Sequence, residues 1–483
     1  MVFSSSREAR THKRLVSRRW SSLNFDRVNV LGDDASYGHS GCVNALSWAR
    51  DGELLLSGGD DRTVQIWRMD PAVPHEYPFV CRSVIATNHT ANIFNVQMLP
   101  YSSNIVTVAG DGEVQVHGLG EIASSGSAAT AQNSRHTCIH RFLCHENRVK
   151  RAVSEDSPHL FLTVAEDKTV RQHDLRMPHE CHYGSCPPPL LKLNFELSTL
   201  SLSPLTPFQF VVAGESAYGY LFDRRQAGRF LLEERGMVEN GMTHCVRRFG
   251  RPPRAVDHHN VDHITGCRMS AQNGHELLSN KFSAAYSADA VYLYSTLDAP
   301  EDGTAFSSRL SRGDDTPELS RSNPASTTDS TMEVDDDSSE TDRESHLFQS
   351  LDNQIPLDAY SGVPMILPRQ RFAGARNMAT IKDVNFLGPN DEYVVSGSDD
   401  GNLFIWRKDG ALHGIFEGDS AVVNVIEGHP QLPLFAASGI DTTIKLFGPV
   451  SGPSMFSRID AAERIIAANA RQSVGYRRVR SSI

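Results

Sequence analysis

Two short polar motifs carry residue types that can hold the surface of another protein. Each has the pattern aromatic-Asp-x-Arg, with His counted as aromatic, and they are His173-Asp174-Leu175-Arg176 and Phe222-Asp223-Arg224-Arg225. The planar guanidinium group of Arg binds carboxylates and backbone carbonyl groups, while its aliphatic stem covers apolar surface. The chemistry that these residues indicate is therefore noncovalent recognition.

A second group contains His and Cys, the side chains that bind Zn²⁺. His179, Cys181, His182 and Cys186 lie close together in a loop that ends Pro187-Pro188-Pro189. A zinc site normally has pairs of ligands at defined spacing, and this cluster lacks them. We therefore interpret it as an ordinary loop and predict no metal and no cofactor. The same interpretation applies to His258, His259 and His263, which lie beside Asp257 and Asp262.

Sequence patterns of known catalytic sites are missing. There is no Walker loop, no glycine pattern for a nucleotide and no Gly-x-Ser-x-Gly nucleophile motif. Scattered Ser, His and Asp residues do not define a site without such a pattern. We predict no catalytic residue and do not expect an enzyme.

The elements that position the two Arg motifs come from a recurring unit. Its first copy begins at Gly38-His39, continues through β-rich runs at 42–48, 54–57 and 63–67, and ends in Trp67. Turn residues separate these runs, as expected for consecutive antiparallel strands. A similar copy at 380–406 ends in Trp406, and weaker copies lie between the two.

Seven copies are present, and their third strands end at residues 67, 117, 173, 222, 294, 406 and 447. A period of about 40 to 50 residues, with Gly-His at the start and Trp at the end, is the WD-repeat signature. It predicts an all-β, seven-bladed β-propeller with four strands in each blade. The short strand at 27–31 is expected to complete the last blade and so join the two ends of the ring.

Several polar residues of the repeats are predicted to be structural. In the first copy, a hydrogen-bonded chain from loop to strand is expected to fix the blade, as WD repeats generally do. The third copy keeps the loop residues but ends in His173 instead of Trp, so its chain is expected to be imperfect. The residues assigned to these networks are His39, Ser57, Asp61, Trp67, His145, Asp167, Ser396, Asp400, Trp406 and Asp441.

Composition limits the class of protein and its partners. The 483 residues are 39% hydrophobic, enough for a packed core. No apolar run approaches the about 20 residues of a membrane span, and eight Cys are too few for a disulfide scaffold. The first residues lack an apolar stretch, so no secretory signal is expected. An intracellular protein of the nucleus, the cytoplasm or both is expected. The net charge of −11 repels phosphate backbones, so nucleic acid is not an expected partner.

Charge also divides the chain into segments. Residues 299–362 are predicted to be a disordered insertion after the third strand of blade five, because their first 47 residues hold 13 acidic side chains and 16 Ser and Thr. Serines beside acids suit an acid-directed kinase, and an unmodified linker has the same composition. The insertion separates blades one to five (25–298) from blades six and seven (363–450).

Basic tails flank the propeller at 1–24 and 451–483. They are compatible with nuclear import, with binding to an acidic protein, or with no specific role. Residues 459–471 have apolar side chains at helical spacing. They predict a helix that packs on the propeller or binds a partner.

The two Arg motifs resemble the WDxR box of the substrate receptors of cullin-4 RING ubiquitin ligases. His173 and Phe222 stand where that box usually has Trp. The opening repeat at 38–62, the later repeat at 372–406 and the acidic insertion before it are also similar to the DDB-one- and cullin-four-associated factors.

This resemblance implies a non-catalytic substrate receptor. Asp174, Arg176, Asp223, Arg225 and a helix within the N-terminal segment would dock on the ligase adaptor, the damage-specific DNA-binding protein one. Protein substrates would bind the opposite face and be presented for ubiquitination by other subunits. The alternative is a WD-repeat scaffold of another assembly, for instance a chromatin or RNA-processing complex.

Overall fold

The structure is a computed structural model of the whole chain. It describes residues 20, 23–33, 37–73, 76–119, 130–133, 137–177, 179, 181, 186–225, 245–250, 262–283, 290–300, 360 and 362–480. Residues 1–300 and 364–483 form one compact unit, and residues 301–363 form a second one. The first unit contains every strand described below. The predicted N-terminal docking helix, apart from Trp20, and residues 301–359 of the predicted insertion lie outside the described ranges.

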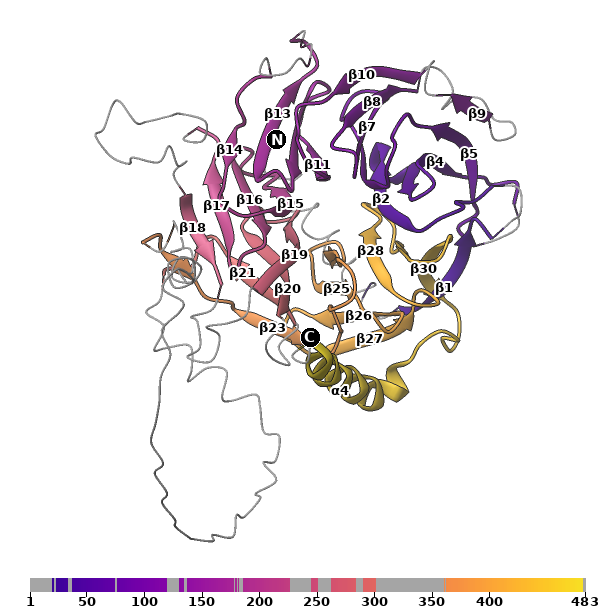
Figure 1. The fold of residues 1–483 in the computed structure, drawn as a ribbon. Coiled ribbons are helices and arrows are strands. Elements are labelled where there is room, and N and C mark those ends of the chain that lie inside the picture. The colour runs from indigo at the N-terminus through magenta and orange to yellow at the C-terminus, as the bar shows by residue number, and fades with distance from the viewer. Residues whose placement is uncertain are drawn as a thin grey trace, which may run out of the picture. The chain divides into compact units, whose positions relative to one another are not determined.

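The first unit is a ring of seven antiparallel sheets, which confirms the predicted seven-bladed β-propeller (Figure 1). The repeats found in the sequence each supply one blade. Blade one contains β2 (Val43–Ala49), β3 (Leu54–Gly59), β4 (Thr63–Met69) and β5 (Phe79–Ala86). Blade two contains β6 (Ile93–Met98), β7 (Asn104–Ala109), β8 (Val114–Gly118) and β10 (Cys138–Phe142). Blade three contains β11 (Val149–Ser154), β12 (Leu160–Ala165), β13 (Thr169–Asp174) and β14 (Leu191–Lys192).

The remaining blades follow in chain order around the ring. Blade four contains β15 (Leu197–Leu202), β16 (Gln209–Gly214), β17 (Gly219–Asp223) and β18 (Cys245–Phe249). Blade five contains β19 (Asp262–Met269), β20 (Glu276–Ser283), β21 (Ala290–Ser295) and β23 (Gln370–Ala373). Blade six contains β24 (Val384–Leu387), β25 (Tyr393–Gly397), β26 (Asn402–Arg407) and β27 (Leu412–Glu417). Blade seven contains β28 (Val423–Gly428), β29 (Phe435–Gly439), β30 (Ile444–Val450) and β1 (Asn24–Leu31).

Blade seven closes the ring in the way that the sequence predicts. β1 pairs antiparallel with β30, from Asn24 opposite Val450 to Leu31 opposite Ile444. A strand near the start of the sequence therefore completes the blade built from the last repeat. This pairing joins the two ends of the repeat array within one sheet.

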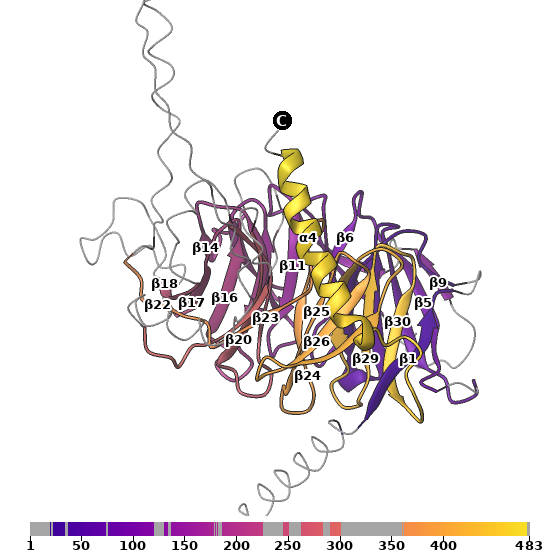
Figure 2. The same ribbon diagram turned by 90° about the horizontal axis from the view of Figure 1, so that it is seen from below.

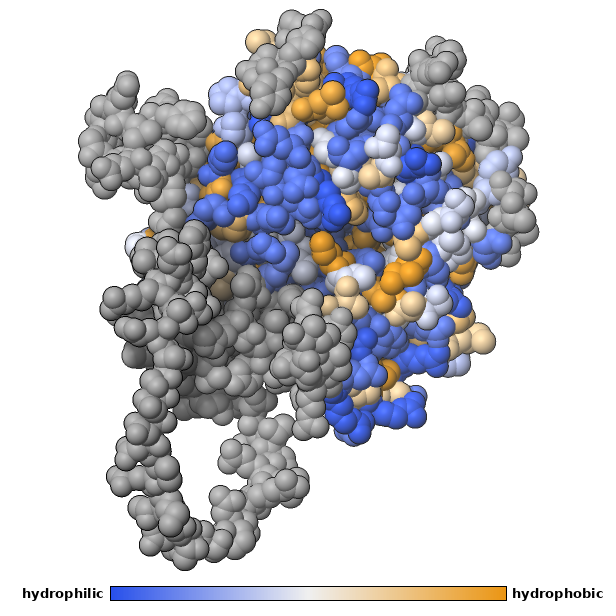
Figure 3. All heavy atoms as spheres, in the orientation of Figure 1, coloured by the Kyte–Doolittle hydropathy of each residue, from blue (hydrophilic) through white to orange (hydrophobic). Residues whose placement is uncertain are grey.

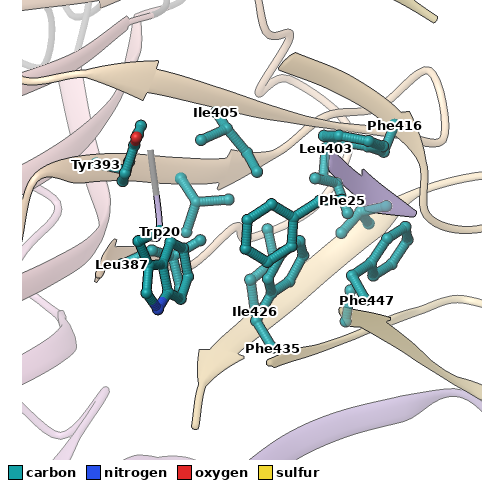
Figure 4. Close-up of a cluster of buried hydrophobic side chains, with 13 residues drawn as sticks. Trp20, Phe25, Leu387, Tyr393, Leu403, Ile405, Phe416, Ile426, Phe435 and Phe447 are labelled. Carbon is teal, nitrogen blue, oxygen red and sulfur yellow. The ribbon is translucent and has the colours of Figure 1, made fainter. Parts of the chain in front are cut away.

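An aromatic cluster beside β1 fixes this closure. Trp20 and Phe25 have ring centroids 4.8 Å apart, and Phe25 also contacts Phe435 of blade seven. Trp20 reaches Tyr393 of blade six, with 6.0 Å between the ring centroids. Figure 4 shows these side chains directed into one cluster between the two blades. The point where the N-terminal segment joins the propeller is therefore buried between blades six and seven.

The acidic insertion falls inside one blade. β21 and β23 are paired neighbours in blade five, with Ala290 opposite Ala373, and residues 296–369 connect them. The range 363–450 thus carries the fourth strand of blade five as well as blade six and the first three strands of blade seven. Two short strands extend other blades: β9 (Thr130–Asn133) pairs parallel with β5, and β22 (Met365–Ile366) pairs parallel with β18.

The first strands of the blades contact one another around the centre of the ring. Two ion pairs cross this centre between residues that are far apart in the sequence. Arg151 of blade three binds Asp383, just before β24, at 2.7 Å, and Arg268 of blade five binds Glu427 of blade seven. Burial raises the pKa of Glu427 above its ordinary value, and the nearby guanidinium of Arg268 offsets only part of this rise. The ring is thus held across its centre by charges as well as by its neighbouring blades.

One helix packs on the rim of the ring. The chain after β30 forms a 3₁₀ turn, η3 (Ile459–Ala461), and then α4 (Ala462–Arg480). Ile465 and Ile466 contact the buried cluster of blades five and six, and α4 lies along this edge of the ring in Figure 2. Among the described residues, no helix is both long enough and apolar enough to cross a membrane.

Candidate protein-binding face

The polar residues of blade one form a continuous hydrogen-bonded chain. His39 Nδ1 lies 3.0 Å from a carboxylate oxygen of Asp61, and His39 Nε2 lies 2.8 Å from Ser57 Oγ. Because a carboxylate only accepts, Nδ1 carries the proton and Nε2 accepts from Ser57. The indole N–H of Trp67 then donates to Ser57 Oγ at 2.9 Å. The four residues assigned from the sequence are brought together and link the loop to the third strand.

Blade three contains the same chain with a different last member. His145 lies 2.8 Å from Asp167 and 2.7 Å from Thr163 Oγ1. His173 Nε2 lies 2.9 Å from the same hydroxyl group, in the position that Trp67 takes in blade one. Burial lowers the pKa of His173 well below its ordinary value, so the ring is neutral and donates one N–H, as indole does. The prediction that the hydrogen-bonded chain of blade three is imperfect is therefore wrong, because His173 completes it.

Blade two has a chain that the sequence interpretation missed. His89 lies 3.1 Å from Asp111 and 2.9 Å from Thr107 Oγ1. In all three blades, His precedes the hydroxyl residue by 18 positions and Asp by 22. That constant spacing identifies His89, even though Asn88 stands where a Gly is usual.

Blade six does not bring its three assigned residues into such a chain. Trp406 donates its indole N–H to the backbone oxygen of Ala373 at 3.2 Å, and not to Ser396. Asp400 accepts from Asn469 of α4 at 2.9 Å. Both partners lie outside the β24–β26 hairpins. The late repeat therefore keeps the sequence pattern, while its polar groups bind β23 and the C-terminal helix.

Blade seven also departs from the pattern. Asp441 accepts from the hydroxyl group of Thr443 at 2.9 Å and forms an ion pair with Lys445. Lys445 also reaches Asp419, which precedes the blade at the position that His occupies in blade one. A lysine ion pair thus replaces the histidine chain.

The two Arg motifs lie at equivalent positions in adjacent blades. Asp174 and Asp223 are the last residues of β13 and β17, and the Arg residues follow in the next turn. Arg176 donates from Nε and Nη2 to the two carboxylate oxygens of Asp174 at 2.9 and 2.7 Å. Arg225 makes the same fork to Asp223, at 2.9 and 2.5 Å. Each Asp therefore orients its own Arg.

The guanidinium groups of Arg176 and Arg225 are both held in place by Asp and accessible to solvent. The side chains of Arg176 and Arg225 are 59% and 65% exposed. Hydrogen bonds from the Arg side chains lower the pKa of both Asp174 and Asp223, so both carboxylates are ionised at neutral pH. Within the described part of the chain, Nη1 of neither Arg makes a hydrogen bond. A binding partner can thus meet preorganised donors without breaking the internal fork.

Apolar side chains lie on the same face of the ring as the two Arg residues. Arg225 lies over the ring of Phe208 at 3.8 Å, which supports the guanidinium from below. The loops that follow first and third strands lie on the same face of the ring, because consecutive strands are antiparallel. On this face, Met177, Leu205 and Leu297 of blades three, four and five are more than half exposed. Exposed Arg beside apolar side chains is the composition of a protein-binding surface.

The start of β1 lies on this face too. β30 is a third strand and ends on it, and Asn24 pairs with Val450 at that end. The basic N-terminal segment therefore joins the ring on the face that carries Arg176 and Arg225, near blades six and seven. Figure 3 shows one face of the molecule, on which hydrophilic side chains predominate and hydrophobic ones form smaller groups.

The cysteine and histidine residues of the 179–186 loop are partly brought together. His179, Cys181 and Cys186 converge, and they are joined by Cys144, which the sequence interpretation did not include. His182, His258, His259 and Asp257 lie outside the described residues. His263 is in β19, and burial lowers the pKa of its imidazole.

Fold and sequence agree on the class of this protein. Residues 34–68 and 372–407 match the family model described as WD domain, G-beta repeat. Those ranges include the first three strands of blades one and six, which carry the clearest copies of the repeat. The chain therefore forms a seven-bladed β-propeller that contains WD repeats.

Curated relatives are distant. WD repeat protein iqw1 of Schizosaccharomyces pombe is 34% identical over 53% of this chain and 31% of its own length. WD and tetratricopeptide repeats protein 1 of Homo sapiens is 25% identical over 90% of this chain and 88% of its own length. DDB1- and CUL4-associated factor 6 of Mus musculus is 26% identical over 55% of this chain and 27% of its own length. The chain thus spans about a third or less of the yeast and mouse relatives.

Proposed function

We propose that this protein is a non-catalytic substrate receptor of a cullin-4 RING ubiquitin ligase. In this proposal, Arg176 and Arg225 dock on the adaptor of the ligase, and protein substrates bind elsewhere on the propeller. The observation that carries the proposal is the pair of exposed Arg side chains at equivalent positions of adjacent blades, each held by its own Asp.

The energetics of protein interfaces support this use of the two residues. Arg is enriched among the residues that contribute most to binding, especially beside apolar contacts that exclude water. Met177 follows Arg176 directly, and Phe208 packs under Arg225. Because the Asp forks already restrict both side chains, little conformational entropy is lost when a partner binds.

The similarity to DDB1- and CUL4-associated factor 6 supports the choice of partner. That relative is named for its association with the adaptor and the cullin, and it matches about half of this chain. The basic segment that leads to Trp20 adds a second proposed contact, since it joins the propeller on the Arg face.

The proposal predicts that adaptor binding depends on the two Arg residues together. The experiment measures the affinity of purified adaptor for the wild-type chain and for Arg176→Ala/Arg225→Ala. We expect the dissociation constant to rise about 100-fold, since loss of a central interface Arg commonly costs about 2 kcal/mol or more. Circular dichroism and the unfolding temperature check that the double variant is folded.

A matched control removes two other Arg residues that follow third-strand Trp residues on the same face. Arg68→Ala/Arg407→Ala lowers the charge by the same amount in blades one and six, and should leave the affinity within about threefold of wild type. Absence of wild-type binding would overturn the proposal in favour of a scaffold in another assembly. Equal losses in the two double variants would show attraction by net charge alone.

A further inference from the structure

Four potential metal ligands meet at the outer edge of blades two and three. Cys144 lies in the short connection between β10 and β11, whereas His179, Cys181 and Cys186 lie in the loop between β13 and β14. Their sulfur and imidazole nitrogen atoms are all within 4.8 Å of one another. Two separate segments of the chain therefore deliver one compact set of three thiols and one imidazole.

Three of the six distances among these atoms are close to the edges of a tetrahedron around one metal ion. Cys144 Sγ lies 3.2 Å from His179 Nε2 and 3.5 Å from Cys181 Sγ, and Cys181 Sγ lies 3.1 Å from His179 Nε2. Around a tetrahedral Zn²⁺, with Zn–S of about 2.3 Å and Zn–N of about 2.0 Å, the corresponding edges are about 3.8 Å for S–S and about 3.5 Å for S–N. The three measured edges need to lengthen by only a few tenths of an ångström.

The surroundings also suit thiolate ligands. The backbone N–H of Leu143 points at Cys181 Sγ, 3.2 Å away, as second-layer donors do in zinc sites. The ring of Phe142 stacks on His179 with an angle of 15° between the planes, which fixes the imidazole orientation. Three packed thiols satisfy one another only weakly, whereas a cation would compensate three thiolates.

We propose that Cys144, His179, Cys181 and Cys186 bind one Zn²⁺ ion in a closed, structural Cys₃His site. Binding converts three thiols to thiolates and releases three protons to solvent, while neutral His179 coordinates through Nε2. With four protein ligands, no coordination position is left for substrate or water. The site fastens the loop that follows Arg176 to the preceding blade.

A disulfide is the competing chemistry for Cys144 and Cys181. Their sulfur atoms are 3.5 Å apart, and a disulfide requires about 2.05 Å. It would also leave Cys186 and His179 without a role. Four converging donors are explained together by a metal and only in part by a disulfide.

The test measures zinc in the full-length protein, purified with reductant and without chelator. We expect about one zinc per chain, and far less in Cys181→Ser and in Cys186→Ser. The matched control is Cys42→Ser, which removes a half-buried thiol of blade one and should retain the metal. Removal of zinc with a strong chelator should lower the unfolding temperature, and added zinc should restore it.

Cobalt gives a readout that does not depend on folding of the variants. Wild-type protein stripped of zinc and loaded with Co²⁺ should show the visible absorption of a tetrahedral thiolate site and the thiolate-to-metal charge-transfer band. Zinc well below one per chain together with no cobalt spectrum would overturn the proposal. Loss of two titratable thiols without reductant, in the absence of bound metal, would assign the disulfide instead.

Discussion

At the residue scale, buried His and Asp pairs are the main polar feature of the propeller. His39, His89 and His145 each join an Asp to a hydroxyl group inside a blade. Buried networks of this kind are rigid when every member is bonded, and costly when one partner is removed. Their role is therefore to fix loop positions on the strands.

These networks predict how the protein responds to acid. Burial raises the pKa of Asp61, but hydrogen bonds from His39 and from two backbone N–H groups lower it to about 2, below the ordinary 3.8. Asp167 behaves in the same way beside His145, with a pKa of about 2. The unfolded chain therefore takes up protons first, and the stability that these groups contribute is lost as the pH falls from about 4 to about 2.

Denaturant unfolding of wild type and Asp61→Asn/Asp167→Asn at about pH 5 and about pH 3 measures this effect. The variant should be less stable at the higher pH and lose less free energy of unfolding between the two. Asp409→Asn, at an exposed turn, is the control and should follow wild type. Parallel losses in all three proteins would refute the assignment.

Residues that lie close together in the sequence could be assigned to a common group more readily than residues that lie far apart. The chain of His39, Ser57, Asp61 and Trp67 follows from local repeat spacing. His173 was misjudged because sequence alone does not show that a neutral imidazole takes the place of an indole. Cys144 was missed because it lies 37 residues before Cys181, and only the packing of two blades brings them together.

At the element scale, the third strands end close to where the repeats predict them, since turn residues and β-branched runs mark each hairpin. β9 and β22 were not predicted. They are four and two residues long and pair parallel with a blade edge, which leaves no periodic pattern in the sequence. The helix predicted at 459–471 is present and continues to Arg480 as α4.

Contacts of α4 predict that it is part of the folded propeller. Asn469 is buried, and it donates to Gly374 O and to Asp400, each at 2.9 Å. Asn469→Ala should lower the free energy of unfolding by about 1–3 kcal/mol, because two acceptors lose their donor. Arg464→Ala, on the exposed side of the helix, should change it by less than about 0.5 kcal/mol. Equal unfolding curves for wild type and Asn469→Ala would mean that α4 is not docked in solution.

At the scale of the whole propeller, closure by β1 joins the two ends of the ring, and two ion pairs link non-adjacent blades across its centre. The ring then has two faces with different connections. The face that bears the ends of the third strands carries Arg176, Arg225 and the start of β1. We propose this face for the adaptor, which leaves the opposite loops for protein substrates.

Two features of this arrangement could not be predicted from the sequence. The pairs Arg151–Asp383 and Arg268–Glu427 join residues more than 150 positions apart, so no local pattern signals them. The bidentate forks to Asp174 and Asp223 show why the Asp of each motif matters: it orients the Arg. The motif is visible in the sequence, whereas the hydrogen bonds that orient each Arg are visible only in the structure.

The most direct test of the proposed docking face is hydrogen–deuterium exchange of the chain with and without purified adaptor. We expect slower exchange at 174–177, 203–208 and 223–225 when the adaptor is bound. The loop at 440–443, on the opposite face of blade seven, should exchange at the same rate in both samples. Slower exchange only at the opposite loops, with no change around Arg176 and Arg225, would contradict the account.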